Sequence, residues 1–190
     1  MNQPGKVIII TAPSGSGKTS ITRYLLQQFP QLAFSISATT RKPRGEEVHG
    51  REYYFLSEED FKQKIKEDAF VEWEMVYEGK YYGTLKSEIT RMWNDGQVPV
   101  LDIDVQGALH IKQQLPGLVL SIFIEAPSIE ELRKRLESRG TETEETIHVR
   151  LSKAAYEMSF KHQFDAIVVN DNLERAQKEA ASIIEAFLAK

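Results

Sequence analysis

A glycine- and serine-rich octapeptide between an apolar run and a helical pattern constrains the fold of this chain more than any other feature. Residues 12–19 read Ala-Pro-Ser-Gly-Ser-Gly-Lys-Thr and fit the phosphate-loop pattern, with Ala12 in place of the usual first glycine. The preceding Lys6–Thr11 is apolar and β-branched, and apolar positions recur at helical spacing in Thr19–Phe29, which Pro30 ends. This order predicts the first strand, turn and helix of an α/β fold.

Strand-like and helical segments then alternate along the chain. Four more runs resemble buried strands: Leu32–Ile36, Val98–Ile103, Leu118–Ile124 and Ala166–Val169. Helical patterns lie after or between them: Val105–Leu115, Ser128–Arg139, Thr146–Phe160 and Leu173–Leu188. This alternation predicts an α/β protein whose core is a five-stranded parallel sheet.

One stretch departs from the rhythm and predicts a second unit. Residues 38–92 contain a polar loop (41–51), aromatic alternating segments (52–56 and 70–82) and a helix after Ser57, capped with help from Asp60. We therefore expect a core formed by residues 1–37 and 93–190 and a small, mixed β insertion formed by residues 38–92. The charged segment 138–150 is expected to be a mobile cover, part of a helical lid at about 128–155.

Composition excludes several classes of function. The 190 residues include no cysteine, which excludes disulfides, cysteine-ligated zinc and thiol nucleophiles. The net charge of −4 disfavours a nucleic-acid-binding role. No run approaches the ~18 apolar residues of a membrane span, and no secretory signal is visible at the N-terminus, so we expect a cytoplasmic protein without membrane or nucleic-acid partners. The four histidines lack metal-ligand spacing and are expected to be structural or surface residues: His49, His110, His148 and His162.

The phosphate loop carries a definite chemistry. Its glycines let successive backbone N–H groups point at phosphate oxygens, and the helix starting at about Lys18 adds its positive dipole end. Lys18 can reach the β- and γ-phosphates of a nucleoside triphosphate, and the Thr19 hydroxyl can bind magnesium. The expected ATP-binding residues of the loop are Ala12, Pro13, Ser14, Gly15, Ser16, Gly17, Lys18, Thr19 and Ser20. The alternative is a flexible Gly/Ser turn.

Two acids follow the strand at 98–101 and belong to the same predicted edge of the sheet. Asp102 and Asp104 share a face because side chains alternate along a strand, and either can orient magnesium or its waters. For Asp104 the alternative is a helix cap.

A basic loop predicts a second anion site. Arg41 and Arg44 lie three residues apart around Pro43, and guanidinium groups bind phosphate bidentately. Tyr53 and Tyr82 add neutral hydroxyl donors. The alternative is a solvated basic loop.

Several segments together resemble guanylate kinase, in order and over nearly the whole chain. They are residues 12–19, 37–44, 47–53 (EVHGREY), 72–73, 81–84, 101–107 (LDIDVQG) and 139–145 (RGTETEE). The resemblance implies a P-loop kinase that transfers a phosphoryl group from ATP to GMP with Mg2+, giving ADP and GDP, with dGMP as an expected second acceptor. It also implies a parallel-sheet core, a GMP-binding insertion and a lid.

The resemblance assigns roles position by position. The expected GMP-binding residues are Ser37, Arg41, Arg44, Glu47, Tyr53, Glu72, Tyr82, Thr84, Asp102, Asp104, Gly107 and Arg150. On the ATP side the lid-side residues Arg135 and Arg139 join the phosphate loop, and Asn170 and Asp171 match the adenine side. The residues expected in catalysis are Lys18, Arg41, Asp104, Arg139 and Arg150. Magnesium is assigned to Thr19, with Asp104 acting through water.

The chemistry of guanine supports these assignments. Guanine presents N1–H and a 2-amino group side by side, and one carboxylate such as Glu72 accepts from both, while Ser37 or Thr84 donates to O6. Adenine would leave the carboxylate facing an acceptor. Without the resemblance, Glu72 would equally be a surface carboxylate. Likewise, Arg135 and Arg139 share a helix face and could simply pair with nearby glutamates instead of forming a cationic clamp.

Three rival functions are less consistent with the sequence. A non-catalytic interaction module of this fold would be expected to have a degraded phosphate loop, whereas Lys18 and Thr19 are intact. A kinase for another nucleoside monophosphate is disfavoured by Ser37, Glu72 and Thr84. An ATPase acting on protein or nucleic acid is disfavoured by the acidic charge and small size. The sequence predicts no oligomeric state.

Overall fold

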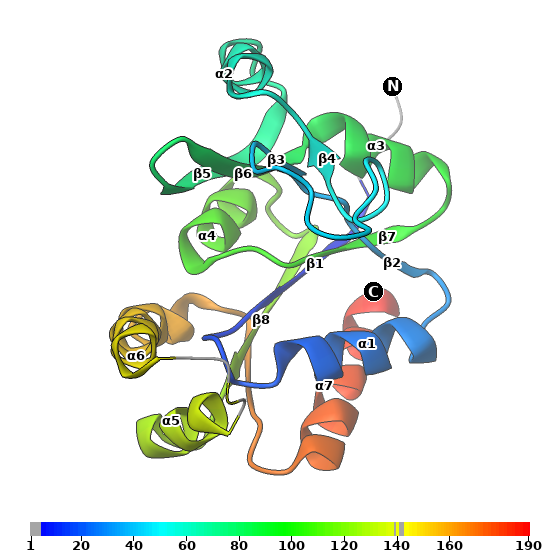
Figure 1. Cartoon of the computed structure of the whole chain (residues 1–190). Helices are drawn as coiled ribbons and strands as arrows, with labels where there is room; N and C mark the ends of the chain where they lie inside the picture. The colour runs from blue at the N-terminus through cyan, green and yellow to red at the C-terminus, as the bar shows by residue number, and fades with distance from the viewer. Residues whose placement is uncertain (1–4, 139, 141–142) are drawn as a thin grey trace.

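Five parallel strands form the central sheet of the computed structural model, which describes residues 5–138, 140 and 143–190 (Figure 1). In spatial order they are β2 (Leu32–Phe34), β7 (Val98–Leu101), β1 (Val7–Thr11), β8 (Val119–Glu125) and β9 (Ala166–Val169). Every neighbouring pair is parallel, which confirms the predicted core. The predicted strands are each within two residues of the observed ends.

The strands of this sheet are apolar on both faces because helices cover both. Alternate residues of β1 point to opposite sides: Ile8 and Ile10 pack with α1 (Lys18–Gln28) and α7 (Leu173–Leu188). Val7 and Ile9 pack on the other side, with α4 (Val105–Gln114). Two-sided burial explains why these runs lack a polar alternation.

The insertion has its own sheet and its own small core. Its strand order is β4 (Tyr54–Phe55), β3 (Ala38–Thr39), β6 (Lys80–Leu85) and β5 (Phe70–Tyr77). The pair β3–β4 is parallel and the other pairs are antiparallel, as the expected mixed sheet requires. Helix α2 (Glu58–Lys66) covers this sheet with Phe61, whose ring stacks on Phe70 at 4.3 Å. Ser57 caps α2, accepting from the Asp60 N–H at 3.0 Å.

Helix α3 (Lys86–Asn94), for which the sequence analysis made no prediction, leads from the insertion back to the core. It follows β6 directly and buries Ile89 and Met92, in contact with both β6 and β7. Its nine residues span only two turns, which is a weak periodic signal in sequence.

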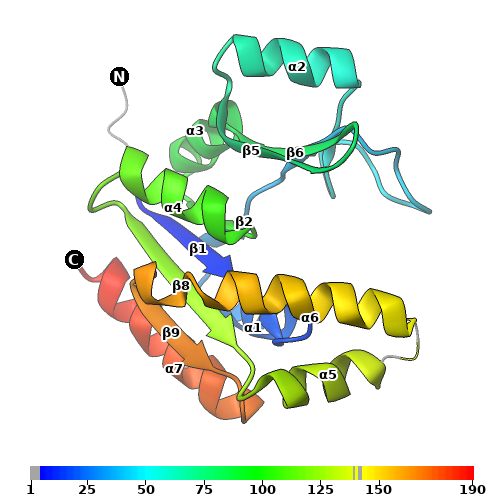
Figure 2. The same cartoon turned by 90° about the vertical axis from the view of Figure 1, so that its left-hand side faces the viewer.

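Two helices, α5 (Ile129–Glu137) and α6 (Glu144–Met158), pack on each other beside the sheet (Figure 2). Leu132 and Leu136 of α5 meet Ile147 and Ala154 of α6 in a separate apolar cluster. Residues 144–150 of the expected cover are helical and form the first turns of α6, and the mobility of this cover stays a prediction. Thr143 caps this helix and accepts from the Thr146 N–H at 3.3 Å. A short 3-10 turn (Lys161–Gln163) then leads to β9.

In Figure 2 the insertion and the α5–α6 pair lie on opposite sides of the end of β1. Both therefore lie near the turn that leads into α1, which is where the phosphate loop was predicted. In the part of the chain that the structure describes, no helix has both the length and the apolar character needed to cross a bilayer.

Substitution of Phe61 by Ala is expected to loosen the insertion without loosening the core. Phe61 is fully buried in the insertion's own cluster, and removing a buried aromatic ring costs about 3–5 kcal/mol. Hydrogen exchange followed by mass spectrometry should show faster exchange in β5 and β6 and unchanged exchange in β1 and β8. Lys62→Ala, at a half-exposed position of the same helix, is the matched control. Equal loss of protection in β1 and β8 would show that the two units unfold together.

Candidate active site

The turn from β1 into α1 has a backbone that requires glycine at two positions. Gly15 and Gly17 have φ of +95° and +91°, in the left-handed region. At Gly17 a Cβ atom would lie 2.1 Å from the Asn170 Nδ2 atom, so a side chain is excluded there on steric grounds as well. Ala12 needs no such freedom, because its own φ is negative: among the described residues other than glycine, only Asp68 has a positive φ. Helix α1 begins at Lys18, as predicted.

The residue behind this loop is Asn170, at the end of β9. Its side chain is 5% exposed and donates from Nδ2 to the Ser16 carbonyl at 2.8 Å. Its own carbonyl accepts from Arg135 Nη2 at 2.9 Å, which ties α5 to the same point. The sequence analysis placed Asn170 on the adenine side; in this structure its amide supports the phosphate loop.

Lys18 meets an acid at the edge of the sheet. Its ammonium group contacts Asp102, which directly follows β7. Burial lowers the pKa of Lys18 to about 8, while the Glu157 carboxylate opposes this shift and the Lys153 ammonium adds to it. The contact with Asp102 favours the charged form of Lys18, so a cation faces the loop.

A cavity of about 550 Å³ opens in front of the loop, within the size range of ligand pockets. Its lining combines the phosphate loop with Asp102 and with one face of α6. The residues from α6 are Thr146, Val149, Arg150, Lys153 and Glu157. Arg150 Nη1 donates to Ser14 Oγ at 2.7 Å, so a predicted lid-side arginine reaches the loop.

The arginine-rich loop of the insertion is organised around Glu47. Arg41 forms a two-pronged pair with this carboxylate, from Nη1 to Oε2 at 2.6 Å and from Nη2 to Oε1 at 2.7 Å. The Arg44 N–H donates to the same carboxylate at 2.8 Å, and the Arg41 guanidinium lies over the Tyr53 ring at 4.7 Å. Arg41 is the main reason that the pKa of Glu47 falls to about 2. Glu47 thus holds the guanidinium plane in the geometry that a phosphate would use.

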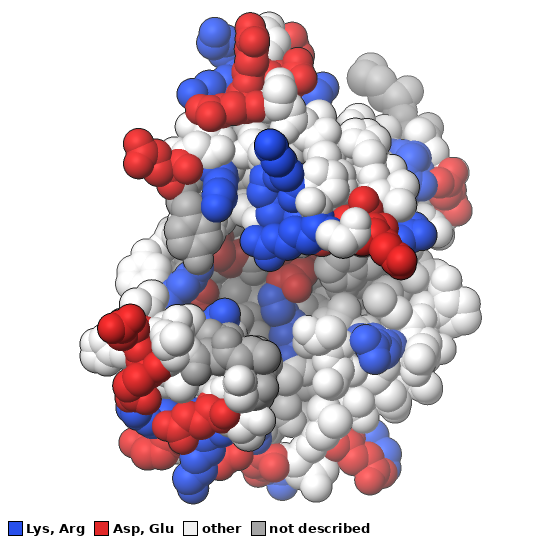
Figure 3. Space-filling model, viewed as in Figure 1, with Lys and Arg blue, Asp and Glu red and all other residues white. Residues whose placement is uncertain are grey.

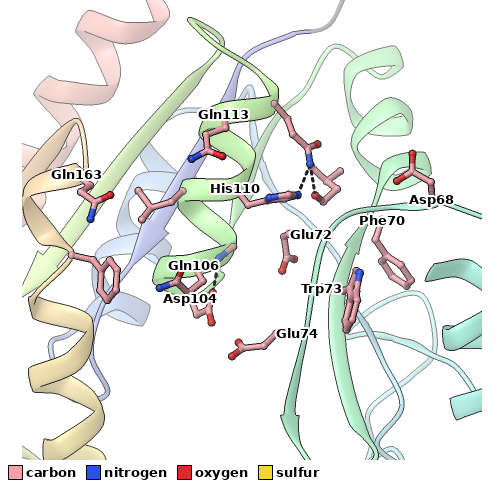
Figure 4. Close-up of a pocket in the computed structure, with 15 residues that line it drawn as sticks. Asp68, Phe70, Glu72, Trp73, Glu74, Asp104, Gln106, His110, Gln113 and Gln163 are labelled. Carbon is pink, nitrogen blue, oxygen red and sulfur yellow. Dashed lines mark hydrogen bonds between the residues drawn. The ribbon is translucent and has the colours of Figure 1, made fainter. Parts of the chain in front are cut away.

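Glu72 lies inward on the edge strand of the insertion, opposite Thr84 in register (Figure 4). The Thr84 hydroxyl donates to Glu72 Oε1 at 2.7 Å. Burial raises the pKa of Glu72 to about 7; the Thr84 bond opposes the shift and the Asp104 carboxylate adds to it. The pair predicted to read guanine is therefore brought together.

Asp104 and Gly107 lie directly across from Glu72, at the start of α4. Asp104 Oδ1 accepts from the Gly107 N–H at 2.7 Å, so this side chain caps α4, as the helix-cap alternative predicted. A Cβ atom at position 107 would lie 3.1 Å from Glu72 Oε2, and glycine keeps that approach open.

Glu74 is a site residue that the sequence analysis missed. It shares the inward face of β5 with Glu72 and points towards Asp104 (Figure 4). A hydrogen bond with Asp104 and burial raise the pKa of Glu74. The period-two alternation from Glu72 would have identified it. Lys153 and Glu157 were also missed, although their spacing from Arg150 places them on one face of a helix.

The two predicted sites join at Lys18. A second cavity of about 250 Å³ is lined on the insertion side by Ser37, Tyr53, Glu72 and Tyr82. On the core side it shares Lys18, Asp102, Lys153 and Glu157 with the cavity of the phosphate loop. Figure 3 shows basic side chains along the insertion's edge of this hollow and both signs of charge inside it.

Some predicted residues stand apart from this junction. Arg41 and Arg44 line neither cavity, although Arg41 lies over the ring of Tyr53, which lines the second one. Asp171 contacts Arg175 on the surface. Arg139 lies outside the described residues. Of the histidines, His49 accepts from the Phe55 N–H at 3.1 Å and His110 contacts Gln114. Within the described ranges there is no group of three or more His, Asp or Glu side chains arranged to hold a metal ion.

A phosphate loop beside an edge acid, a helix reaching over it and an adjoining cleft lined by a buried acid and tyrosines are typical of a P-loop kinase of the nucleoside monophosphate type. Comparison with known proteins agrees: the family model described as guanylate kinase matches residues 4–187. The chain belongs to the guanylate kinase family, whose reaction is the ATP-dependent phosphorylation of GMP.

Individual relatives support this membership over almost the whole chain. The guanylate kinase of Bacteroides thetaiotaomicron is 52% identical over 186 residues, covering 98% of this chain and 91% of the relative. The guanylate kinase of Caldanaerobacter subterraneus is 45% identical, covering 97% of this chain and 88% of the relative. Among solved structures, guanylate kinase from Anaplasma phagocytophilum aligns with a TM-score of 0.74 at 29% identity, covering 98% of this chain and 87% of that one.

Replacing Asn170 by Ala is expected to raise the KM for ATP about tenfold, because the Ser16 carbonyl loses a buried donor and the loop loses its rear support. The KM for GMP should stay within about twofold of the wild-type value, because none of the described contacts of Asn170 involves a residue proposed to bind GMP. Steady-state kinetics with each substrate varied in turn measures both constants. A similar rise in both would mean that Asn170 acts on the whole fold.

Proposed function

We propose that the chain transfers the γ-phosphoryl group of ATP to GMP, giving ADP and GDP, and that it also accepts dGMP. One observation supports this above the others: Glu72, bonded to Thr84, lines a cavity that reaches Lys18 of the phosphate loop. The cavity therefore has a carboxylate and a hydroxyl at one end and the phosphate-loop lysine at the other. These groups match the base and the phosphate of a guanine nucleotide that is to be phosphorylated.

The guanine end selects by hydrogen bonding. An ionised Glu72 accepts from N1–H and the 2-amino group, and Thr84 or Ser37 donates to O6. Adenine would place a lone pair against the carboxylate and leave a buried acceptor unpaired, which costs about 1–3 kcal/mol or more for a charged group. Such a site rejects the wrong base strongly.

The phosphate end works by positioning and charge. Arg41 and Arg44, with the Tyr53 and Tyr82 hydroxyls, hold the GMP phosphate so that one of its oxygens attacks the γ-phosphorus of ATP in line. Lys18 exchanges its contact with Asp102 for the triphosphate. Arg150, together with Arg139, offsets the charge shared by the two nucleotides as the lid closes.

Magnesium is proposed to accompany ATP. Thr19 and Asp102 both line the cavity in front of the phosphate loop, and Asp104 lies two residues beyond Asp102. Oxygen ligands of this kind suit Mg2+. We assign the ion to Thr19, with Asp104 acting through water. When bound, the ion neutralises phosphate charge and orients the β- and γ-oxygens.

The division of labour follows the two units. Residues 1–37 and 93–190 are proposed to bind ATP, with the lid at about 128–155, and residues 38–92 to bind GMP. The proposed partners are these small molecules, and the proposed location is the cytoplasm, where both nucleotides are available. An interaction module without activity would not need the Lys18–Asp102 contact or the junction of the two cavities.

A coupled ADP-release assay tests the proposal directly. With ATP and Mg2+, GMP should give rapid turnover, dGMP slower turnover, and AMP, UMP and CMP close to none. Lys18→Ala should abolish turnover, because Lys18 is the lysine of the phosphate loop itself, the side chain that reaches the β- and γ-phosphates. A chain that turns over AMP or UMP as fast as GMP would show that the acceptor is misassigned.

The use of GMP is expected to depend on pH through Glu72. Its ligand-free pKa is raised from 4.5 to about 7, so below pH 7 the carboxyl is mostly protonated and offers one good acceptor fewer. The kcat/KM for GMP should therefore fall as the pH is lowered from 8 to 6, approaching tenfold per unit below the pKa.

Glu72→Gln separates this effect from other titrations. The variant keeps Glu74 and the GMP phosphate, which also titrate in this range, but lacks the Glu72 carboxyl. We expect it to have a low kcat/KM for GMP at pH 8, a flatter pH profile and a reduced preference for GMP over AMP. An unchanged GMP/AMP preference would contradict the guanine-reading role of Glu72.

A further inference from the structure

The chain passes between the core and the insertion twice, and both passages meet at one buried carboxylate. The entry passage is residues 35–37, which follow β2; the Ser35 N–H makes its bond to the core sheet at the Val100 carbonyl, 3.0 Å away. The exit passage is helix α3, which returns the chain to β7 (Figure 1). Glu88 lies in the first turn of α3 and is 2% exposed.

Glu88 accepts hydrogen bonds from three separate segments. On the entry passage the Ile36 N–H donates to Oε1 at 3.3 Å. On β4 the Tyr54 hydroxyl donates to Oε2 at 2.8 Å. On α3 itself Arg91 donates from Nη2 to Oε1 at 2.9 Å and from Nε to Oε2 at 3.0 Å. Although burial opposes ionisation, the bonds from Arg91, Tyr54 and Ile36 together lower the pKa of Glu88.

These partners show that Glu88 does more than stabilise its own helix. A first-turn acid can act on the helix dipole alone, and an acid–arginine pair three residues apart can be a local surface pair. Here two of the donors come from positions 34 and 52 residues away in the chain. An arginine pair also supplies the charge compensation that a buried carboxylate requires.

The entry passage carries a residue of the acceptor site. Ser37 follows Ile36, and its carbonyl accepts from the Tyr54 N–H at 2.9 Å. The next residue, Ala38, begins β3 and pairs with Gly83, the neighbour of Thr84. Ser37 is therefore held between two residues, Ile36 and Tyr54, that both bond to Glu88.

We propose that Glu88 is a positioning residue for the acceptor site: it binds the entry passage to α3 and so keeps Ser37 in the guanine pocket opposite Glu72 and Thr84. This inference rests on the proposed function. It predicts an effect on GMP and little effect on ATP, because the described contacts of Glu88 all lie on the insertion side of the core.

Two variants and one control test the inference by steady-state kinetics well below their melting temperatures. Glu88→Gln should raise the KM for GMP about tenfold, and Tyr54→Phe, which removes one hydroxyl, about threefold. For both, kcat and the KM for ATP should stay within about twofold. Asp95→Asn is the matched control, because it removes the exposed partner of Arg91 Nη1 at 2.9 Å and leaves Glu88 in place. It should behave as the wild type.

Hydrogen exchange of the peptide covering residues 35–38 gives a readout that does not depend on activity. Exchange should be faster in Glu88→Gln and Tyr54→Phe than in wild type and Asp95→Asn, while exchange in β1 and β8 stays unchanged. If Glu88→Gln does not fold, Tyr54→Phe decides the question.

The outcomes separate the inference from the function on which it rests. Suppose that the wild type phosphorylates GMP. The role of Glu88 alone is then overturned by any of three results in the variants: unchanged exchange at 35–38, an unchanged KM for GMP, or equal rises in the KM values for GMP and ATP. Absence of GMP turnover in the wild type would overturn the proposed function, and the guanine-positioning role with it.

Discussion

The conformation of the turn between β1 and α1 determines where every other part of the site must lie. Two left-handed glycines curl its backbone, and the buried Asn170 amide holds the Ser16 carbonyl from behind. Because this turn leaves the middle strand of a parallel sheet, it projects from the edge at which β7 ends, next to Asp102. Helix α6 and strand β5 approach this point from either side, and residues of both line cavities that include Lys18.

The cations proposed to bind phosphate are engaged with carboxylates. Lys18 contacts Asp102, and Arg41 is held by both oxygens of Glu47. Such pairing keeps the positive groups oriented, so a nucleotide meets side chains that have already lost their rotational freedom. The proposed guanine end shows the opposite arrangement: Glu72 is a buried acid without a cationic partner among its described contacts, and its raised pKa reflects the cost of charging a buried carboxyl.

The sequence predicted the core well because burial on both faces leaves an unambiguous pattern in β1, β8 and β9. It predicted the phosphate loop and, through family resemblance, the Glu72–Thr84 pair. Contacts that join distant segments were beyond it. The residues around Glu88 in the sequence do not indicate that the Tyr54 hydroxyl donates to it. Those around Asn170 do not indicate that its amide supports the phosphate loop. Glu74 could have been predicted from the sequence, because it lies two residues after Glu72 and side chains two apart on a strand share a face. Helix α3 was missed because it is only nine residues long, although Ile89, Met92 and Trp93 recur in it at helical spacing.

The neighbouring positions of β2 and β7 in the core sheet have a consequence for how such enzymes diversify. Parallel neighbours need a crossover connection, since the chain must return from the end of one strand to the start of the next. The whole insertion, from β3 to α3, occupies that connection. The unit proposed to bind the acceptor is thus an elaborated crossover whose two ends are already brought together by the sheet. Its length and contents can change over evolutionary time while the strand pairing beneath it stays the same.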